Sequence, residues 1–147
     1  MSPAFWTKYS LSKNPKHEIR NTKQIRMTEI QNSKQYDLED RTLIFAKRVR
    51  DFVYKLPKIT GNFEDGSQLI RASGSVGANY IEANESLSKK DFFMRIKISR
   101  KEAKESRFWL KLVRTNNQQE LEKERESLIQ EATELMNIFG SIIRKSE

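Results

Sequence analysis

Basic side chains recur at regular intervals between residues 96 and 114, where they could form a surface that binds phosphates. If Ile96, Ala103 and Leu110 face the core of a helix, their seven-residue spacing places two further rows of residues on one side of that helix. Those rows consist of Lys97, Lys104 and Lys111 and of Arg100, Arg107 and Arg114. At 1.5 Å per residue they extend over roughly 25 Å, enough to meet several phosphates. The spacing therefore predicts a face that binds RNA or DNA.

Acidic residues further along the chain offer this basic face a different partner. Four glutamates repeat at intervals of three, four and seven residues, and they could neutralise the basic face within one chain or between subunits. They are Glu120, Glu124, Glu131 and Glu134. Both interpretations remain open, and we interpret Phe108 and Trp109 as packing residues rather than as platforms on which bases stack.

Two pairs of carboxylates have a spacing that could bring four oxygen ligands together. Glu82 and Glu85 lie three residues apart, as do Glu102 and Glu105. Di-iron bundles arrange Glu in this way, but they add Glu-x-x-His pairs that this chain lacks. We therefore expect no metal site and no other cofactor. The basic residues expected to neutralise the carboxylates are Arg71, Arg100 and Lys101.

The chain offers little to a catalytic mechanism. It contains no cysteine, and its one histidine, His17, has no neighbour that would fix it as a ligand or base. Because a nucleophile, a base and a group to orient them cannot be assembled, we expect no enzymatic activity. The lack of cysteine fits a reducing cytoplasm. No segment has the ~20 apolar residues of a membrane span or the pattern of a secretory signal, so we expect a cytoplasmic protein without membrane contact.

The segment Gly74-Ser75-Val76-Gly77 allows two interpretations. Gly-x-x-Gly loops grip nucleic-acid backbones in KH domains, but that module needs flanking strands, and the sequence predicts none. A glycine inside a helix costs about 1 kcal/mol relative to alanine, so a helix here needs a compensating close contact. We favour the helix. The small partners expected on the next helix are Ser99, Ala103 and Ser106.

Apolar residues spaced by three and four predict four helices. The first starts after Asp37, with Asp40 as its N-cap, and is ended by Pro57 and Gly61. The others are expected at about 63–86, at about 89–114 and from about 120 through Ile143, with Ser88 as the cap of the third. Short links between four helices favour an all-α, antiparallel up-and-down four-helix bundle.

Residues 1–36 differ from the rest in composition and predict a flexible, disordered tail. They show no sustained helical or strand period. They hold seven Lys or Arg against two Glu, and so carry five of the chain's eight net positive charges. The sequence thus divides into a basic tail, 1–36, and a bundle, 37–147. Met27 is a possible natural start, which would leave residues 1–26 as an extension.

The bundle region resembles a bacterial family encoded in the intervening sequences of 23S ribosomal RNA genes. The resemblance covers residues 36 to about 144 and is carried by short pieces in three helices. These are Leu56-Pro57, Ile70-Arg71-Ala72-Ser73, Ser75-Val76, Asn79, Glu82-Ala83, Asp91-Phe92, Glu102-Ala103 and Glu105. Some members are called S23 ribosomal proteins, a name that does not establish a place in the ribosome.

This resemblance implies an up-and-down four-helix bundle that assembles as a homopentamer. It also implies kinship to the accessory variability protein of diversity-generating retroelements, which works with a reverse transcriptase and contacts nucleic acid through a basic surface. The family has no assigned enzymatic activity. The apolar residues expected between subunits are Ile44, Ile59, Ile138 and Ile143.

Together these features predict a non-enzymatic, oligomeric bundle protein that binds RNA or DNA through the basic face of its third helix. The alternative is a scaffold whose main partner is another protein, such as a reverse transcriptase. The identity of that nucleic acid or protein does not follow from the sequence.

Overall fold

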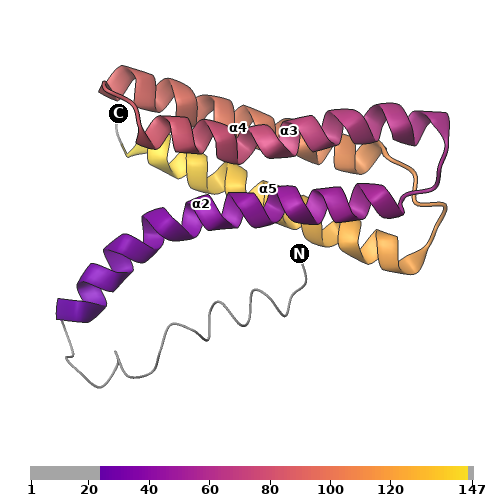
Figure 1. Ribbon diagram of the computed structural model, residues 1–147, viewed down its shortest axis with the longest axis horizontal. Helices are drawn as coiled ribbons and strands as arrows, with labels where there is room; N and C mark the ends of the chain where they lie inside the picture. The colour runs from indigo at the N-terminus through magenta and orange to yellow at the C-terminus, as the bar shows by residue number, and fades with distance from the viewer. Residues whose placement is uncertain (1–23, 146–147) are drawn as a thin grey trace. The chain divides into compact units, whose positions relative to one another are not determined.

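The computed structural model describes residues 24–145, with side chains from Leu38 onward, and all regular structure in this range is helical (Figure 1). The helices are α2 (Gln24–Lys55), α3 (Thr60–Asn84), α4 (Lys89–Leu112) and α5 (Gln119–Arg144). None of them is long and apolar enough to cross a membrane.

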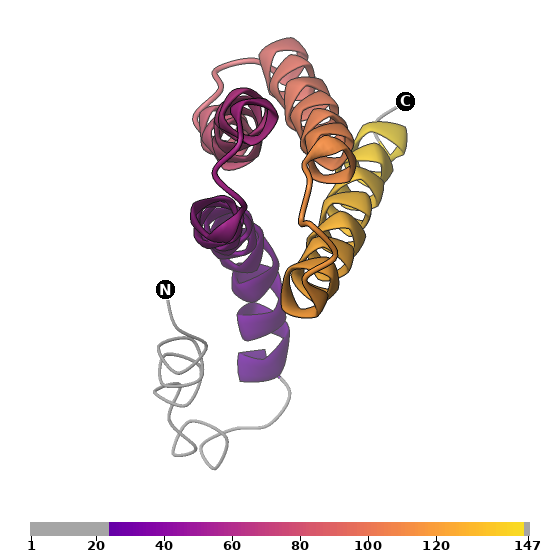
Figure 2. The same ribbon diagram turned by 90° about the vertical axis from the view of Figure 1, so that its right-hand side faces the viewer.

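From Arg41 onward the chain forms one compact unit, in which the four helices surround a common core (Figure 2). Successive helices run in opposite directions and are joined by short links. The predicted all-α, antiparallel up-and-down four-helix bundle is therefore confirmed. The largest fully buried side chains come from all four helices and include Phe45, Phe52, Leu69, Ile96, Leu110, Leu128, Leu135 and Phe139.

The predicted bounds of the last three helices are close to the observed ones, and Ser88 is the cap of α4. Its hydroxyl accepts a hydrogen bond of 3.1 Å from the backbone N–H of Asp91, which satisfies one of the free donors of the first turn. Gly61, expected to end the first helix, lies instead in the first turn of α3. Pro57 does follow the end of α2, as expected from its missing N–H.

The first helix begins much earlier than the sequence predicts. α2 is already helical at Gln24, so Asp40 lies inside the helix and is not its N-cap. Of the predicted tail, residues 1–23 lie outside the described residues, and the part from Gln24 onward belongs to α2. A natural start at Met27 stays a prediction.

Gly74 and Gly77 of α3 face α2, and the prediction that they face α4 was wrong. Gly74 and Gly77 lie within the helix, as expected. A Cβ added to Gly77 would lie 2.7 Å from Oγ1 and 3.1 Å from Cβ of Thr42 on α2. A Cβ on Gly74 would lie 3.6 Å from the guanidinium of Arg50, also on α2. The close crossing that glycine permits is therefore between α2 and α3.

The small residues of α4 lie in the core, where Ser99 contacts α3 closely, as predicted, although it does so without the glycines. Ser99, Ala103 and Ser106 are fully buried. The Ser99 hydroxyl donates a hydrogen bond of 2.9 Å to the backbone carbonyl of Val76, which links α4 directly to α3. A small residue at position 99 thus allows α4 to approach the α3 backbone.

One of the four isoleucines expected between subunits belongs to the core of the chain itself. Ile143 is buried by its own bundle. Ile59 is exposed, while Ile44 and Ile138 are half-buried. The prediction for Ile143 was therefore wrong, because the last turn of α5 packs inward.

Candidate nucleic-acid interface

The side of α4 that faces away from the core carries a continuous row of exposed residues, which we call the outer row of α4. Consecutive members are three or four residues apart and so follow one side of the helix. Every member is exposed, and none is acidic. The outer row consists of Lys90, Met94, Lys97, Lys101, Lys104, Phe108 and Lys111. At 1.5 Å per residue it extends over about 30 Å.

The three predicted lysines, Lys97, Lys104 and Lys111, all lie in this row. In the described part of the chain, none of them forms a salt bridge or a hydrogen bond through its side chain. Lys101, which the sequence analysis did not include, lies among them with its Nζ 3.8 Å from a carboxylate oxygen of Glu102. The three predicted lysines are therefore available to an external anion.

Two of the three predicted arginines, Arg100 and Arg107, lie on the side of α4 that borders α5. Arg107 is half-buried and donates a hydrogen bond of 3.2 Å to the hydroxyl of Thr133. The Cδ of Arg100 approaches the position that a Cβ would occupy on Gly140 of α5. Arg114 is exposed beyond the end of α4. The arginines thus flank the lysines, and the Arg107 side chain already has one hydrogen-bond partner within the bundle.

The acidic residues of α5 do not neutralise this surface within the chain. Glu131 accepts two hydrogen bonds, of 2.7 and 2.8 Å, from the guanidinium of Arg41, which also lies 3.6 Å from Glu134. Glu124 pairs with Arg48 at 3.1 Å. Glu120 is exposed. Three of these four glutamates therefore face α2, because the seven-residue spacing defines a row but not the neighbour it meets.

The four carboxylates of α3 and α4 do not converge. The bond from Ser99 to Val76 sets the antiparallel register, which places Glu102 and Glu105 beside the middle of α3. Glu82 lies in the last turn of α3 and Glu85 is the C-cap of that helix, so both are next to the start of α4. Among the described residues, no group of three or more His, Cys, Asp or Glu could hold a metal ion.

Glu102 on α4 has a raised pKa. Burial of its side chain raises this pKa above the ordinary value of 4.5, and the nearby charge of Glu105 raises it further. Lys101 acts in the opposite direction. The cause is structural, since Glu102 lies on the side of α4 that turns away from the outer row.

Phe108 is exposed, and the interpretation of this residue as a packing residue was wrong. The residue is 57% exposed and lies between Lys104 and Lys111 in the outer row. Trp109, in contrast, is half-buried, and its indole N–H is buried without an acceptor in the described structure. The two rings meet edge to face at 5.0 Å. The three-and-four spacing from Lys97, Lys101 and Lys104 was the signal that could have placed Phe108 outside.

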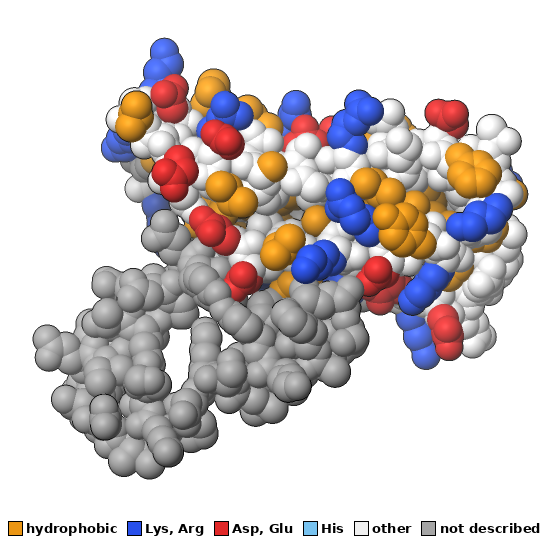
Figure 3. Space-filling view, in the orientation of Figure 1, with side chains coloured by type: hydrophobic (Ala, Val, Ile, Leu, Met, Phe, Trp, Pro, Cys, Tyr) orange, Lys and Arg blue, Asp and Glu red, His pale blue; other side chains and the backbone are white. Residues whose placement is uncertain are grey.

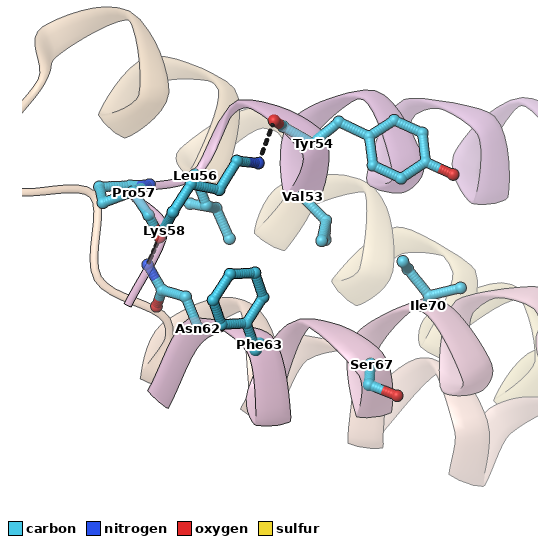
Figure 4. A pocket seen from close by; sticks show the side chains of 9 residues that line it. All are labelled: Val53, Tyr54, Leu56, Pro57, Lys58, Asn62, Phe63, Ser67 and Ile70. Carbon is cyan, nitrogen blue, oxygen red and sulfur yellow. Dashed lines mark hydrogen bonds between the residues drawn. The ribbon is translucent and has the colours of Figure 1, made fainter. Parts of the chain in front are cut away.

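A second surface feature lies at the turn between α2 and α3. Hydrophobic side chains gather between these helices on the face shown in Figure 3, among Lys and Arg side chains. They line a pocket of about 310 Å³, in which the side chains of Val53, Phe63 and Ile70 come from facing helices (Figure 4). Tyr54 and Phe63 at its rim are 64% and 61% exposed.

Comparison with known proteins places these features in a family. Residues 34–141 match the family described as 23S rRNA-intervening sequence protein. A similar solved structure is a protein of unknown function from the S23 ribosomal protein family of Bacteroides thetaiotaomicron. It is 32% identical, with a TM-score of 0.62, and the match covers 71% of this chain and 96% of that one. Comparison with curated proteins gives no match. The extent of the family match shows that this chain belongs to the 23S rRNA-intervening sequence protein family.

Proposed function

We propose that this protein is a non-enzymatic bundle protein that binds RNA or DNA through the outer row of α4 and the flanking arginines. The observation that carries the proposal is the set of three exposed lysines, Lys97, Lys104 and Lys111, which have no acidic partner in the described structure. Unpaired lysines on one side of a rigid helix repel one another, and an anionic polymer relieves that repulsion by replacing their counterions.

The charge distribution supports contact with phosphates rather than with a folded acidic protein. The row is straight, extends over about 30 Å and contains lysine in five of its seven positions. A nucleic-acid backbone supplies negative charge at regular intervals over such a length. The lysines would contact phosphates, which are the same in every sequence, so we expect little sequence preference.

The test replaces Lys97, Lys104 and Lys111 together with Gln in the full chain. Binding to many sequences should weaken about equally, and the slope of log affinity against log salt should fall by about 2 to 3, since each lost phosphate contact contributes ~0.7 to 0.9. Fluorescence anisotropy with labelled RNA and DNA at several salt concentrations measures both quantities. The fold should survive, because these exposed side chains form no hydrogen bond or salt bridge within the described part of the chain.

A matched control removes the same charge elsewhere. The triple replacement of the exposed Lys55, Lys123 and Lys145 with Gln changes the net charge equally but spares α4. It should leave the salt slope close to that of the unchanged protein. If both triple variants lose the same affinity, binding follows net charge and the proposed surface is wrong. If the unchanged protein binds neither RNA nor DNA at low salt, the proposal fails altogether.

The second candidate function is a scaffold that binds another protein, such as a reverse transcriptase. The pocket between α2 and α3 favours it, because exposed Tyr54 and Phe63 at its rim are the kind of aromatic anchors that protein interfaces use. Replacing both with Ser should then abolish capture of the protein partner without changing the salt slope of nucleic-acid binding.

Self-association belongs to both candidate functions. We propose a homopentamer, which light scattering at tens of micromolar protein would detect. A monomer at that concentration would contradict the proposal.

A further inference from the structure

Phe108 interrupts the lysines of the outer row at one position. The preceding member, Lys104, is one helical turn before it, and Lys111 follows it by three residues. At 1.5 Å per residue, the backbone positions of Lys104 and Lys111 lie about 6 Å and about 4.5 Å along the helix axis from that of Phe108. Phe108 is exposed between two lysines that have no partner among the described residues, and it is the only aromatic member of the outer row.

We propose that Phe108 is a stacking platform for an unpaired base, and hence that the ligand of this surface is single-stranded RNA or DNA. This inference rests on the proposed function and names its substrate class. A nucleotide chain presents phosphate, base and phosphate in sequence, and Lys104, Phe108 and Lys111 present the matching order of amino group, ring and amino group.

The orientation of the ring supports stacking. Trp109 contacts the phenyl ring edge to face at 5.0 Å, with the two planes at 81°. An edge contact holds the ring in place and occupies only part of it, which leaves 57% of Phe108 open to solvent. Trp109 is itself half-buried, so this contact joins Phe108 to a residue that packs against the bundle.

A duplex does not offer the same contact. Its bases are stacked on one another, so their faces are hidden, and a ring on the side of a straight helix meets only the backbone or the groove edges. Single strands expose base faces, and stacking on an aromatic side chain tolerates any sequence. The lysines alone would bind both forms, whereas Phe108 contributes only to binding of the single strand.

The experiment compares a labelled single-stranded 20-mer, as RNA and as DNA, with the matching 20-base-pair DNA duplex. Phe108→Ala should weaken single-strand binding by roughly fivefold to a hundredfold, the range for one stacked base. Duplex binding and the salt slope should not change, since no phosphate contact is lost. Phe108→Trp should restore single-strand binding. Leu112→Ala is the matched control, because Leu112 is a comparably exposed apolar residue on the same helix, at 48%, without a π face.

A second readout does not depend on affinity. The chain has two tryptophans, and replacement of Trp6 with Phe leaves Trp109 as the only one. A base stacked on Phe108 lies next to the Trp109 indole, so saturating single strand should quench its emission and saturating duplex should not. The Phe108→Ala replacement in this background should abolish that quenching.

The outcomes separate this inference from the proposed function. If the lysine triple variant loses binding while Phe108→Ala binds single strands normally, the basic surface stands and the stacking inference is overturned. Equal losses for single strand and duplex on Phe108→Ala would also overturn it, because they would point to a general disturbance of α4. If the unchanged protein binds no nucleic acid, the proposed function fails first.

Discussion

The guanidinium of Arg125 on α5 donates a hydrogen bond of 2.6 Å to the carbonyl oxygen of Val113, the residue that caps the C-terminus of α4. The same group lies within hydrogen-bonding distance of the Leu110 and Lys111 carbonyls, at 3.4 and 3.3 Å. It also forms a salt bridge with Glu122. A side chain of α5 thus satisfies the last carbonyls of α4, which have no partner within their own helix.

Replacing Arg125 with Ala should lower the free energy of unfolding by about 1.5 to 3 kcal/mol, the range for hydrogen bonds to a charged group. Urea denaturation followed by circular dichroism measures this change. Arg125→Lys should recover only part of it, since one amino group cannot reach several carbonyls at once. Arg71→Ala, at an exposed helix position, is the control and should change stability little. A loss no larger than that of the control would show that water satisfies the α4 carbonyls equally well.

Gly74 and Gly77 of α3 should respond to alanine in opposite directions. Gly74→Ala meets only the guanidinium of Arg50 at ordinary contact distance, so it should stabilise the protein by up to about 1 kcal/mol through helix propensity. Gly77→Ala places a Cβ 2.7 Å from Thr42 Oγ1, and overpacking typically costs about 1 to 3 kcal/mol. Thermal unfolding of both variants checks the contrast. Similar stabilisation by both would mean that α2 and α3 do not cross tightly at Gly77.

Glu102 should make the protein less stable at neutral pH than at mildly acidic pH. Its pKa in the folded state is raised above the ordinary 4.5, mainly by burial, so the folded state binds this proton more tightly than the unfolded chain does. The resulting stabilisation is fully present below 4.5 and is lost as pH rises through the raised pKa.

Glu102→Gln should therefore increase the melting temperature at pH 7, and the increase should disappear toward pH 4. Melting curves across this range check the prediction, with the exposed Glu126→Gln as a control that should show no such trend. A variant that is less stable than the unchanged protein at pH 7 would show that the contact with Lys101 outweighs burial.

Asn62 should be among the most sensitive polar residues. It is buried, donates to the carbonyls of Pro57 and Arg114 at 3.0 and 2.8 Å, and accepts from the Arg114 N–H at 2.9 Å. Asn62→Ala leaves these groups without partners, which should cost about 1 to 3 kcal/mol each where water cannot reach them. Chemical denaturation measures the loss, and the exposed Asn137→Ala serves as the reference.

The sequence predicts the helices better than it predicts their neighbours. The bounds of α3, α4 and α5, the Ser88 cap and the basic row of α4 follow from local spacing, because capping and periodicity act within one helix. The start of α2 was missed because residues before Asp37 lack an apolar period, although the backbone is helical from Gln24.

The errors concern contacts between helices. The spacing predicts that Gly77 allows another helix to approach closely, but not that Thr42 of α2 is the residue that it contacts. It shows that Glu131 lies in an acidic row, but not that Arg41 is its partner. The exposure of Phe108 was also missed, since an aromatic residue near a core position is more often buried. Such outcomes depend on how each helix rotates about its axis when the bundle packs.

The two links at either end of α4 differ in how they are held, and this difference should appear in the exchange of backbone amide protons with deuterium. The link to α5 is held by Asn62 of α3, by Arg125 of α5 and by its own Thr115. The link from α3 is held by the Ser88 cap, and Leu87 beside it is fully exposed. Local opening should therefore start at the α3 link, and the amides of the first turns of α4 should exchange well before those of its last turns.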